Sequence, residues 1–226
     1  MLERLKQNIC NANKVVAQLE NGYTLLGSAA GIDRETGYIV MRPSATMPSE
    51  LTPEAMLVIK EDGTVIEGEG VPAKDFAAHR ELFTAFRWIN TSIHAHSHYA
   101  ACFAQAGRSI PPYGATHADC FRGEILCTRE LTPREISVHY ERHIGRLITD
   151  SYRYLDEQEL PGILVARHGA FAWGETCDEA IRHIVTLETA AHMAFDSEIL
   201  NAKITPAPSS LVEKHFYRHH KRSSQK

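Results

Sequence analysis

Two histidines that stand two positions apart, His94 and His96, could together bind a transition-metal ion. They lie in the segment 89–100, where Ile93 and Ala95 alternate with them. Successive side chains of a β-strand point to opposite faces, so the two imidazoles would project together while Ile93 and Ala95 enter the core. Imidazole nitrogen suits zinc, iron, nickel or manganese better than calcium. The rest of the chain must supply a further ligand and an acid or base.

A third histidine, His168, follows the apolar run 162–166 and precedes a glycine turn. A histidine at the end of a buried strand can meet residues from other loops, so we take His168 as the third ligand, with an ordinary loop histidine as the alternative. His139 and His143 stand one helical turn apart, but the glutamate that zinc-protease helices carry directly after the first histidine is missing. We therefore interpret this pair as part of a solvated helix face.

Two aspartates stand in segments that could carry chemistry. Asp75 falls in the first turn of a helix predicted over residues 74–86, where the helix dipole favours a negative charge, so a purely capping role is an alternative. Asp119 closes the run Thr116-His117-Ala118-Asp119, inside a loop at 113–121 that is rich in polar groups.

The elements that must position these residues are short strands interleaved with helices. Apolar periodicity, caps and turns predict helices at 2–19, 74–86, 98–106 and 177–200, and one long helix that begins after Thr132 and contains both His139 and His143. Strands are expected at 23–26, 37–41, 124–127 and 162–166, with a small-residue loop at 27–31 and a hairpin at 55–67. Closely spaced early strands favour a substantially antiparallel sheet.

Composition narrows the class of protein. The 226 residues can bury a large core, and the net charge of −4 argues against a general nucleic-acid binder. No apolar run approaches the length of a membrane span, and the first residues lack the apolar segment of a signal peptide. The five cysteines form no Cys-x-x-Cys pair, so no disulfide framework is expected. We expect a cytoplasmic protein without membrane or nucleic-acid partners.

The order of these features resembles the class II aldolase/adducin family, and within it the L-ribulose-5-phosphate 4-epimerase branch. An acidic residue opens a helix, a His-x-His strand follows, and then come a Thr-His-Ala-Asp loop and a histidine at the end of a strand. The similarity spans nearly the whole chain and includes the segments 33–37, 52–60, 79–80, 94–98, 105–107, 116–119, 161–165 and 169–174.

The resemblance implies an α/β fold with three layers, α/β/α, around a central and mostly antiparallel sheet. It makes residues 1–205 one domain and residues 206–226 a basic tail, which either covers a pocket or is partly disordered. It also implies a homotetramer with active sites between subunits. A divalent metal, most often zinc with manganese or cobalt as alternatives, would bind His94, His96 and His168 with Asp75 beside it.

The implied activity is the epimerisation of a sugar phosphate. The C3–C4 bond would break in a retro-aldol step, the aldehyde fragment would rotate, and addition to its other face would invert C4. Asp119 matches one family acid/base, and Asp75 matches the position where the family's aldolases typically carry an acid/base glutamate. An aldolase that releases the fragments is the alternative, and the retained metal and acid residues argue against a non-catalytic adducin-like module.

The resemblance also marks substrate-binding positions, which are Gly27, Ser28, Ser44, Lys74 and Thr116. Around them the chain departs from the family, because the patterns Gly-Asn-Val-Ser, Lys-Pro-Ser-Gly and Ser-Ser are changed at 27–30, 42–45 and 73–74. The family ending Tyr-Tyr-Gly-Gln, which carries a second acid/base, has no counterpart in the printed sequence, and Tyr217 aligns poorly with it. These departures predict an altered substrate, either unphosphorylated, a sugar acid, or differently phosphorylated.

Overall fold

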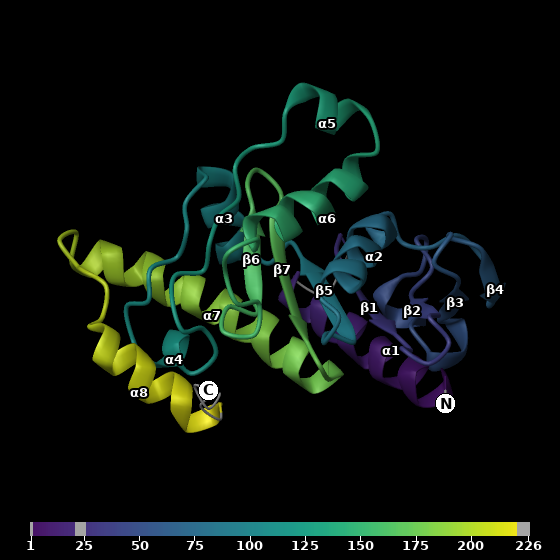
Figure 1. The fold of residues 1–226 in the computed structure, drawn as a ribbon, viewed down its shortest axis with the longest axis horizontal. Coiled ribbons are helices and arrows are strands. Elements are labelled where there is room, and N and C mark those ends of the chain that lie inside the picture. The colour runs from purple at the N-terminus through teal and green to yellow at the C-terminus, as the bar shows by residue number, and fades with distance from the viewer. Residues whose placement is uncertain (1, 21–25, 221–226) are drawn as a thin grey trace.

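The computed structural model describes residues 2–20 and 26–220 (Figure 1). Its helices are α1 (Leu2–Leu19), α2 (Phe76–Ala85), α3 (His98–Ala106), α4 (Ala115–Ala118), α5 (Pro133–Ser137), α6 (Tyr140–Ser151), α7 (Cys177–Leu200) and α8 (Ser209–His219), with short 3₁₀ helices η1 (Pro48–Glu50) and η2 (Pro53–Ala55). Its strands are β1 (Ser28–Ile32), β2 (Ile39–Met41), β3 (Leu57–Ile59), β4 (Val65–Glu67), β5 (Thr91–Ala95), β6 (Gly162–Val165) and β7 (Gly169–Gly174).

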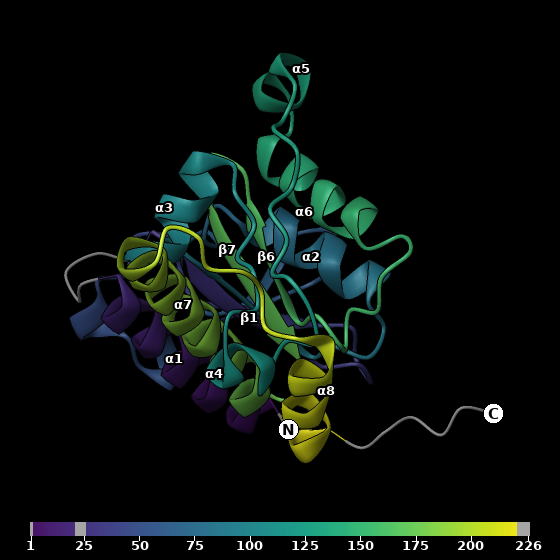
Figure 2. The same ribbon diagram turned by 90° about the vertical axis from the view of Figure 1, so that its left-hand side faces the viewer.

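The strands form one sheet in the order β4-β3-β2-β1-β5-β7-β6, and each neighbouring pair is antiparallel. Helices α1, α3 and α7 supply the core on one face, and α2 and α6 supply the core on the other. Figure 2 shows the sheet between these two helical layers. The predicted three-layer α/β/α fold with an antiparallel sheet is confirmed.

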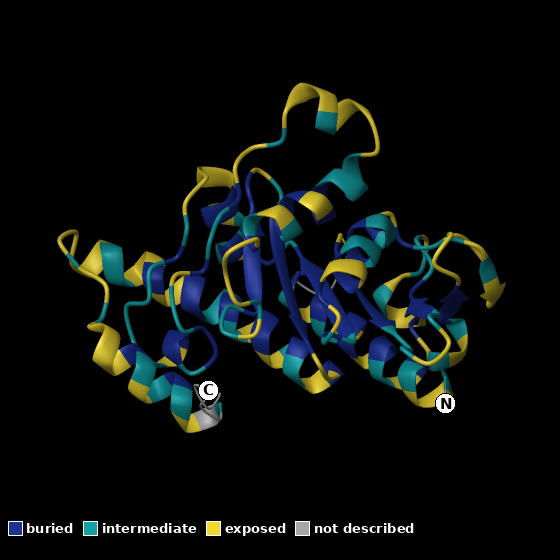
Figure 3. Ribbon diagram, in the orientation of Figure 1, coloured by how far each residue is buried: buried dark blue, intermediate teal, exposed yellow. Residues whose placement is uncertain are grey.

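Alternation along the strands divides the core into two halves. On β7, Ala170 and Ala172 join the α1/α7 half, while Phe171 and Trp173 join the α2/α6 half. On β5, Ile93 and Ala95 are fully buried in the α1/α7 half, as their spacing predicted. The central strands are buried along their length (Figure 3). The side chain of His94 therefore points toward α2 and α6.

The small-residue segment at 27–31 is not the predicted loop, because residues 28–32 form strand β1. Small side chains here permit close packing. A Cβ on Gly27 would stand 2.1 Å from the carbonyl oxygen of His94, and one on Gly31 would stand 2.7 Å from Ile9 Cδ1. The strand predicted at 23–26 lies mostly outside the described residues, and Leu26 itself is a bend.

The long helix predicted after Thr132 is interrupted, so that prediction is wrong. The capping box of Thr132 and Glu135 opens α5 as expected, but Val138 is extended and His139 adopts the left-handed conformation at φ 52° before α6 begins. Helix α5 has no buried residue, and both Ile136 within it and Val138 directly after it are exposed, whereas α6 buries its apolar face against α2. Packing therefore stabilises only the second half as a long helix.

Two further segments differ from a simple pattern. The strand predicted at 124–127 forms only isolated bridges, which join Ile125 to Ile110 and Cys127 to Leu164. The described part of the basic tail contains α8, which lies beside α4 and buries Val212 and Phe216 (Figures 1 and 2). None of the helices in residues 2–20 and 26–220 combines the length and apolarity needed to cross a membrane.

Candidate metal centre

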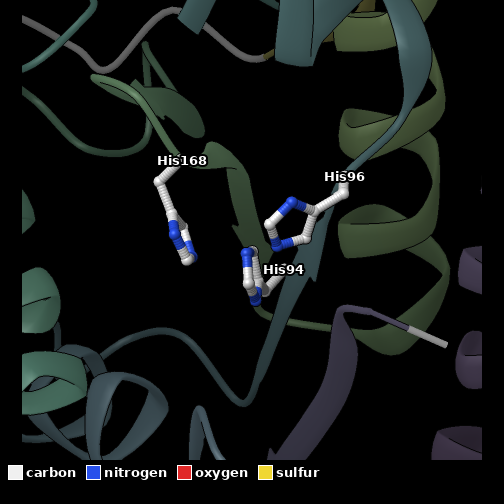
Figure 4. Close-up of side chains that lie close together, drawn as sticks. All are labelled: His94, His96 and His168. Carbon is white, nitrogen blue, oxygen red and sulfur yellow. The ribbon is translucent and has the colours of Figure 1, made fainter. Parts of the chain in front are cut away.

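The three histidines predicted as ligands lie together (Figure 4). His94 is on β5, His96 follows the last residue of that strand, and His168 lies in the turn between β6 and β7. Pairing of His94 with Phe171 across β5 and β7 brings this turn to the end of β5. One ring nitrogen from each histidine can be chosen so that all three lie within 4.8 Å of one another, a spacing that fits a shared metal ion.

The ring of His94 is fixed from two sides. Its Nδ1 lies 2.8 Å from Asp75 Oδ2, and the ring stacks on Phe171 with centroids 4.3 Å apart. Its Nε2 is buried and has no hydrogen-bond partner in the part of the chain that the structure describes. A histidine whose Nδ1–H binds a carboxylate presents the lone pair of Nε2 to a metal. This orphaned buried nitrogen shows that the residues fit a metal ligand set.

Burial keeps the other two histidines neutral. Burial and the neighbouring His94 lower the pKa of His96 to about 4, with partial opposition from Asp75. Burial, His94 and His96 lower the pKa of His168 to about 3. Tyr140 Oη lies 3.0 Å from Nδ1 of His168 and orients its ring. Because metal binding needs deprotonated imidazole, both side chains are in the ligating form at neutral pH.

Asp75 supports the cluster and does not cap its helix. It occupies the N-cap position of α2, but its side chain makes no capping hydrogen bond. Ser28 Oγ donates to Asp75 Oδ1 at 2.7 Å, and His79 Nε2 lies 3.5 Å from Oδ2. Burial alone would raise the pKa of Asp75, but the hydrogen bonds from His79 and His94 outweigh burial and hold that pKa well below its usual range. The carboxylate is therefore charged and faces His94.

The histidines open into a cavity of about 370 Å³. Its lining residues are Leu26, Arg42, Ser44, Ala73, Lys74, Asp75, Ala78, His94, His96, Tyr140, Glu141, Ile144, His168 and Phe171. Ser44 and Lys74, predicted as substrate contacts, are among them. Ser28 is fully buried under Asp75, and Gly27 lies against the backbone of His94, so these two shape the wall of the cavity.

The cationic side of the cavity has two different groups. The buried guanidinium of Arg42 donates to the carbonyl oxygens of Gly27 at 2.9 Å, Pro43 at 3.0 Å and Ser44 at 3.3 Å. Burial lowers the pKa of Arg42, while Asp75 and Glu20 oppose that shift. Arg42 thus ties the loop to β1, whereas the exposed ammonium of Lys74 can reach a ligand.

Asp119 and Thr116 lie elsewhere in the protomer. Neither lines the histidine cavity, and Thr116 lines a separate cavity of about 150 Å³ between α4 and α7. The Asp119 side chain is 40% exposed, and Nδ1 of His215 on α8 lies 3.0 Å from its Oδ1. Figures 1 and 2 show α4 with α8, away from the turn that carries His168.

Two polar residues of the cavity, Tyr140 and Glu141, escaped sequence reasoning. Both begin α6 directly after the interruption at His139. An uninterrupted helix gave no reason to single them out, because their placement depends on the left-handed residue that redirects the chain. The sequence carries no local signal for that break.

Comparison with known proteins identifies the class. Residues 7–195 match the family model for the class II aldolase and adducin N-terminal domain, so the chain belongs to the class II aldolase/adducin family. Among curated proteins it is 35% identical over 219 residues to L-ribulose-5-phosphate 4-epimerase UlaF of Salmonella paratyphi B, covering 97% of this chain and 96% of that protein. The same identity and coverage hold for UlaF of Salmonella paratyphi A.

Solved structures share the fold at lower identity. An L-fuculose 1-phosphate aldolase aligns with a TM-score of 0.77 at 19% identity, over 95% of both chains. L-fuculose 1-phosphate aldolase from Glaciozyma antarctica PI12 aligns with a TM-score of 0.77 at 17% identity, over 96% of this chain and 81% of that one. The family predicted from the order of motifs is confirmed.

Proposed function

We propose that this protein is a metal-dependent sugar-phosphate epimerase of the L-ribulose-5-phosphate 4-epimerase type. The observation that carries the proposal is the set of three imidazoles at the wall of a cavity large enough for a pentose phosphate. Among residues 2–20 and 26–220, the buried Nε2 of His94 has no hydrogen-bond partner. The 35% identity to UlaF over nearly the whole chain supports the same activity.

His94, His96 and His168 would hold the metal, with zinc as our first choice and manganese or cobalt as alternatives. Three neutral histidines leave the ion its full charge and an open position for substrate. A bound divalent ion supplies Lewis acidity, which stabilises negative charge on the substrate oxygens while the C3–C4 bond is broken. Asp75 fixes the ring of His94 for that purpose.

The phosphate group would lie at the mouth of the cavity. Ser44 can donate a hydroxyl hydrogen bond there, and Lys74 can supply a point charge that does not require planar geometry. Gly27 and Ser28 would act indirectly, since Gly27 accepts from Arg42 and Ser28 donates to Asp75. This division of roles accounts for substrate recognition despite the changed family patterns.

Proton transfer at the C4 hydroxyl requires an acid/base. Asp119 does not line the histidine cavity of its own chain, so it cannot serve there. We place Asp119 and Thr116 at the cavity of a neighbouring copy, in a homotetramer with sites between subunits. The second half of α7 supports such an assembly, because it exposes large apolar side chains, which are Met193, Phe195, Ile199 and Leu200. Asp119 would transfer the C4 hydroxyl proton on one side of the fragment, and inversion of C4 requires a second acid/base on the opposite side.

Product analysis tests the reaction. Zinc-loaded protein and L-ribulose 5-phosphate are followed by NMR, with His94→Ala as control. We expect conversion to the C4 epimer, lost in the control. Accumulation of two fragments would establish the aldolase alternative, and turnover of only an unphosphorylated or acidic sugar would contradict the phosphate site at Ser44 and Lys74.

Complementation tests the shared site. His94→Ala and Asp119→Asn are each expected to be inactive, because each removes one half of every site. Co-expression of the two variants should restore part of the activity, since mixed assemblies contain some sites with both halves intact. Inactive mixed assemblies would contradict a site shared between subunits, and full activity of Asp119→Asn alone would place Asp119 outside the catalytic site.

A further inference from the structure

Glu20, the residue after α1, makes contacts that the proposed reaction does not explain. It is only 5% exposed, and its carboxylate accepts three backbone N–H groups. Oε2 accepts from Leu26 at 2.8 Å, and Oε1 accepts from Gly27 at 3.0 Å and from His96 at 2.6 Å. One side chain at the end of α1 thus binds the backbone just before β1 and the backbone N–H of the candidate metal ligand His96.

These donors stand where the ladder between β1 and β5 ends. The register pairs Ser28 with His94, so one further rung would pair Leu26 with His96. Both of those N–H groups instead bind the carboxylate of Glu20. The side chain therefore takes the place of a backbone rung, and β1 separates from β5 at the point where β5 delivers His96.

The same carboxylate is connected to the other side of the cavity. Gly27, which donates to Glu20, accepts a hydrogen bond from Arg42 at 2.9 Å, and Arg42 also holds the backbone of Ser44. A displacement of Gly27 is resisted by the carbonyl of His94, which leaves no room for even a Cβ. The backbone of His96 is thus held by Glu20 directly, and the Ser44 loop is held by it through Gly27 and Arg42.

We propose that Glu20 is a positioning residue that sets the place of His96 relative to His94 by substituting for the missing rung. The inference rests on the proposed function, because it takes these histidines as metal ligands. The property that matters for this role is the reach of the carboxylate, meaning a side chain long enough to accept hydrogen bonds from both β1 and β5. Outer contacts that orient a ligand typically change metal affinity by about 10–100-fold when they are removed.

Two variants separate reach from charge. Glu20→Gln keeps the length, so its amide oxygen can accept from Gly27 and His96, and only the N–H of Leu26 loses its acceptor. Glu20→Asp keeps the charge, but it is one methylene too short to bridge β1 and β5. Asn13→Ala is the matched control, because buried Asn13 also ties α1 to β1, through Ala29 at 3.0 Å, without touching a histidine of the site.

The measurement is zinc affinity of the full-length metal-free proteins, by competition with a chromophoric chelator, with the visible spectrum of the cobalt-loaded proteins as a report on ligand geometry. We expect Glu20→Asp to bind zinc about 10–100-fold more weakly with shifted cobalt bands. Glu20→Gln should stay close to wild type. Asn13→Ala should lower the melting temperature and leave both metal readouts unchanged.

Wild-type affinity in Glu20→Asp, or an equal loss in Asn13→Ala, would overturn the proposal. A loss in Glu20→Gln with none in Glu20→Asp would also overturn it, because charge would then matter and reach would not. No zinc binding by the wild-type protein would overturn this inference and the proposed function together. Variant effects as expected, without turnover of L-ribulose 5-phosphate, would overturn the proposed function alone.

Discussion

Replacement of Asp75 by asparagine should weaken metal binding without disturbing the fold. The amide oxygen can still accept from His94 Nδ1, and the NH₂ group can donate to the hydroxyl of Ser28, which can rotate to accept. What disappears is the negative charge next to His94. Asp75→Asn is therefore a nearly isosteric test of that charge.

The size of the effect follows from the contacts. Hydrogen bonds to charged groups contribute about 1.5–3 kcal/mol, against about 0.5–1.5 kcal/mol for neutral pairs. The 2.8 Å contact with His94 is buried, so the difference of about 1–2 kcal/mol is little screened by solvent. Because each 1.4 kcal/mol is a factor of ten, we expect a loss of roughly tenfold in zinc affinity.

Chelator competition at neutral pH measures this loss, and Asp119→Asn is the control. Asp119 does not line the histidine cavity, so its variant should bind zinc like the wild type while losing turnover. Unchanged affinity in Asp75→Asn would refute the reasoning that its charge strengthens His94 as a ligand. Equal losses in the two variants would refute the separation of metal and proton-transfer roles.

Two further predictions concern stability. Gly27→Ala should unfold at a lower temperature than the wild type, because its Cβ would stand 2.1 Å from the carbonyl oxygen of His94. Gly114→Ala is the control, since a Cβ there meets open space and the melting temperature should not change. Equal melting temperatures of the two variants would contradict this packing. Burial lowers the pKa of His117 and of His183 to about 4, against about 6.5 in the unfolded chain. Between pH 6.5 and 4 the unfolded state therefore binds more protons, and the free energy of unfolding should fall on acidification by up to about 1.4 kcal/mol per pH unit for each histidine. Urea denaturation of the metal-free protein at pH 7 and pH 5 measures the change, and identical free energies would show that these histidines are not held neutral.

The sequence predicted elements whose pattern is local. Helices α3 and α7 have the predicted limits, because caps and apolar periodicity mark both of their ends. The alternation of Ile93 and Ala95 with the histidines predicted which way each side chain of β5 points, since period two is a property of any strand. The ligand triad could be assembled in advance because His94 and His96 share one extended segment and His168 stands at the end of another strand, and the family resemblance supports the same three residues.

The parts that escaped prediction depend on distant contacts. The segment that forms β1 has the composition of a loop, and it becomes a strand because α1 and β5 pack closely on its two sides. The break at His139 follows from the exposure of α5 and the docking of α6, neither of which is visible in the local pattern. Glu20 follows the end of α1, and only its contacts at the end of the β1–β5 ladder give it a role.

The location of β5 in the sheet has a consequence for how the ion arrives. Strand β5 is hydrogen-bonded on one side to β1 and on the other to β7, and its residues are buried between two apolar layers. The backbone that carries His94 is therefore already ordered by the core. Metal binding does not have to offset the conformational entropy that is lost when this segment becomes ordered. In zinc fingers the metal supplies the folding free energy, and a chelator unfolds the domain. In this protein the fold that carries His94 does not depend on the metal ion. Removal of the ion should therefore abolish activity and leave the protein folded.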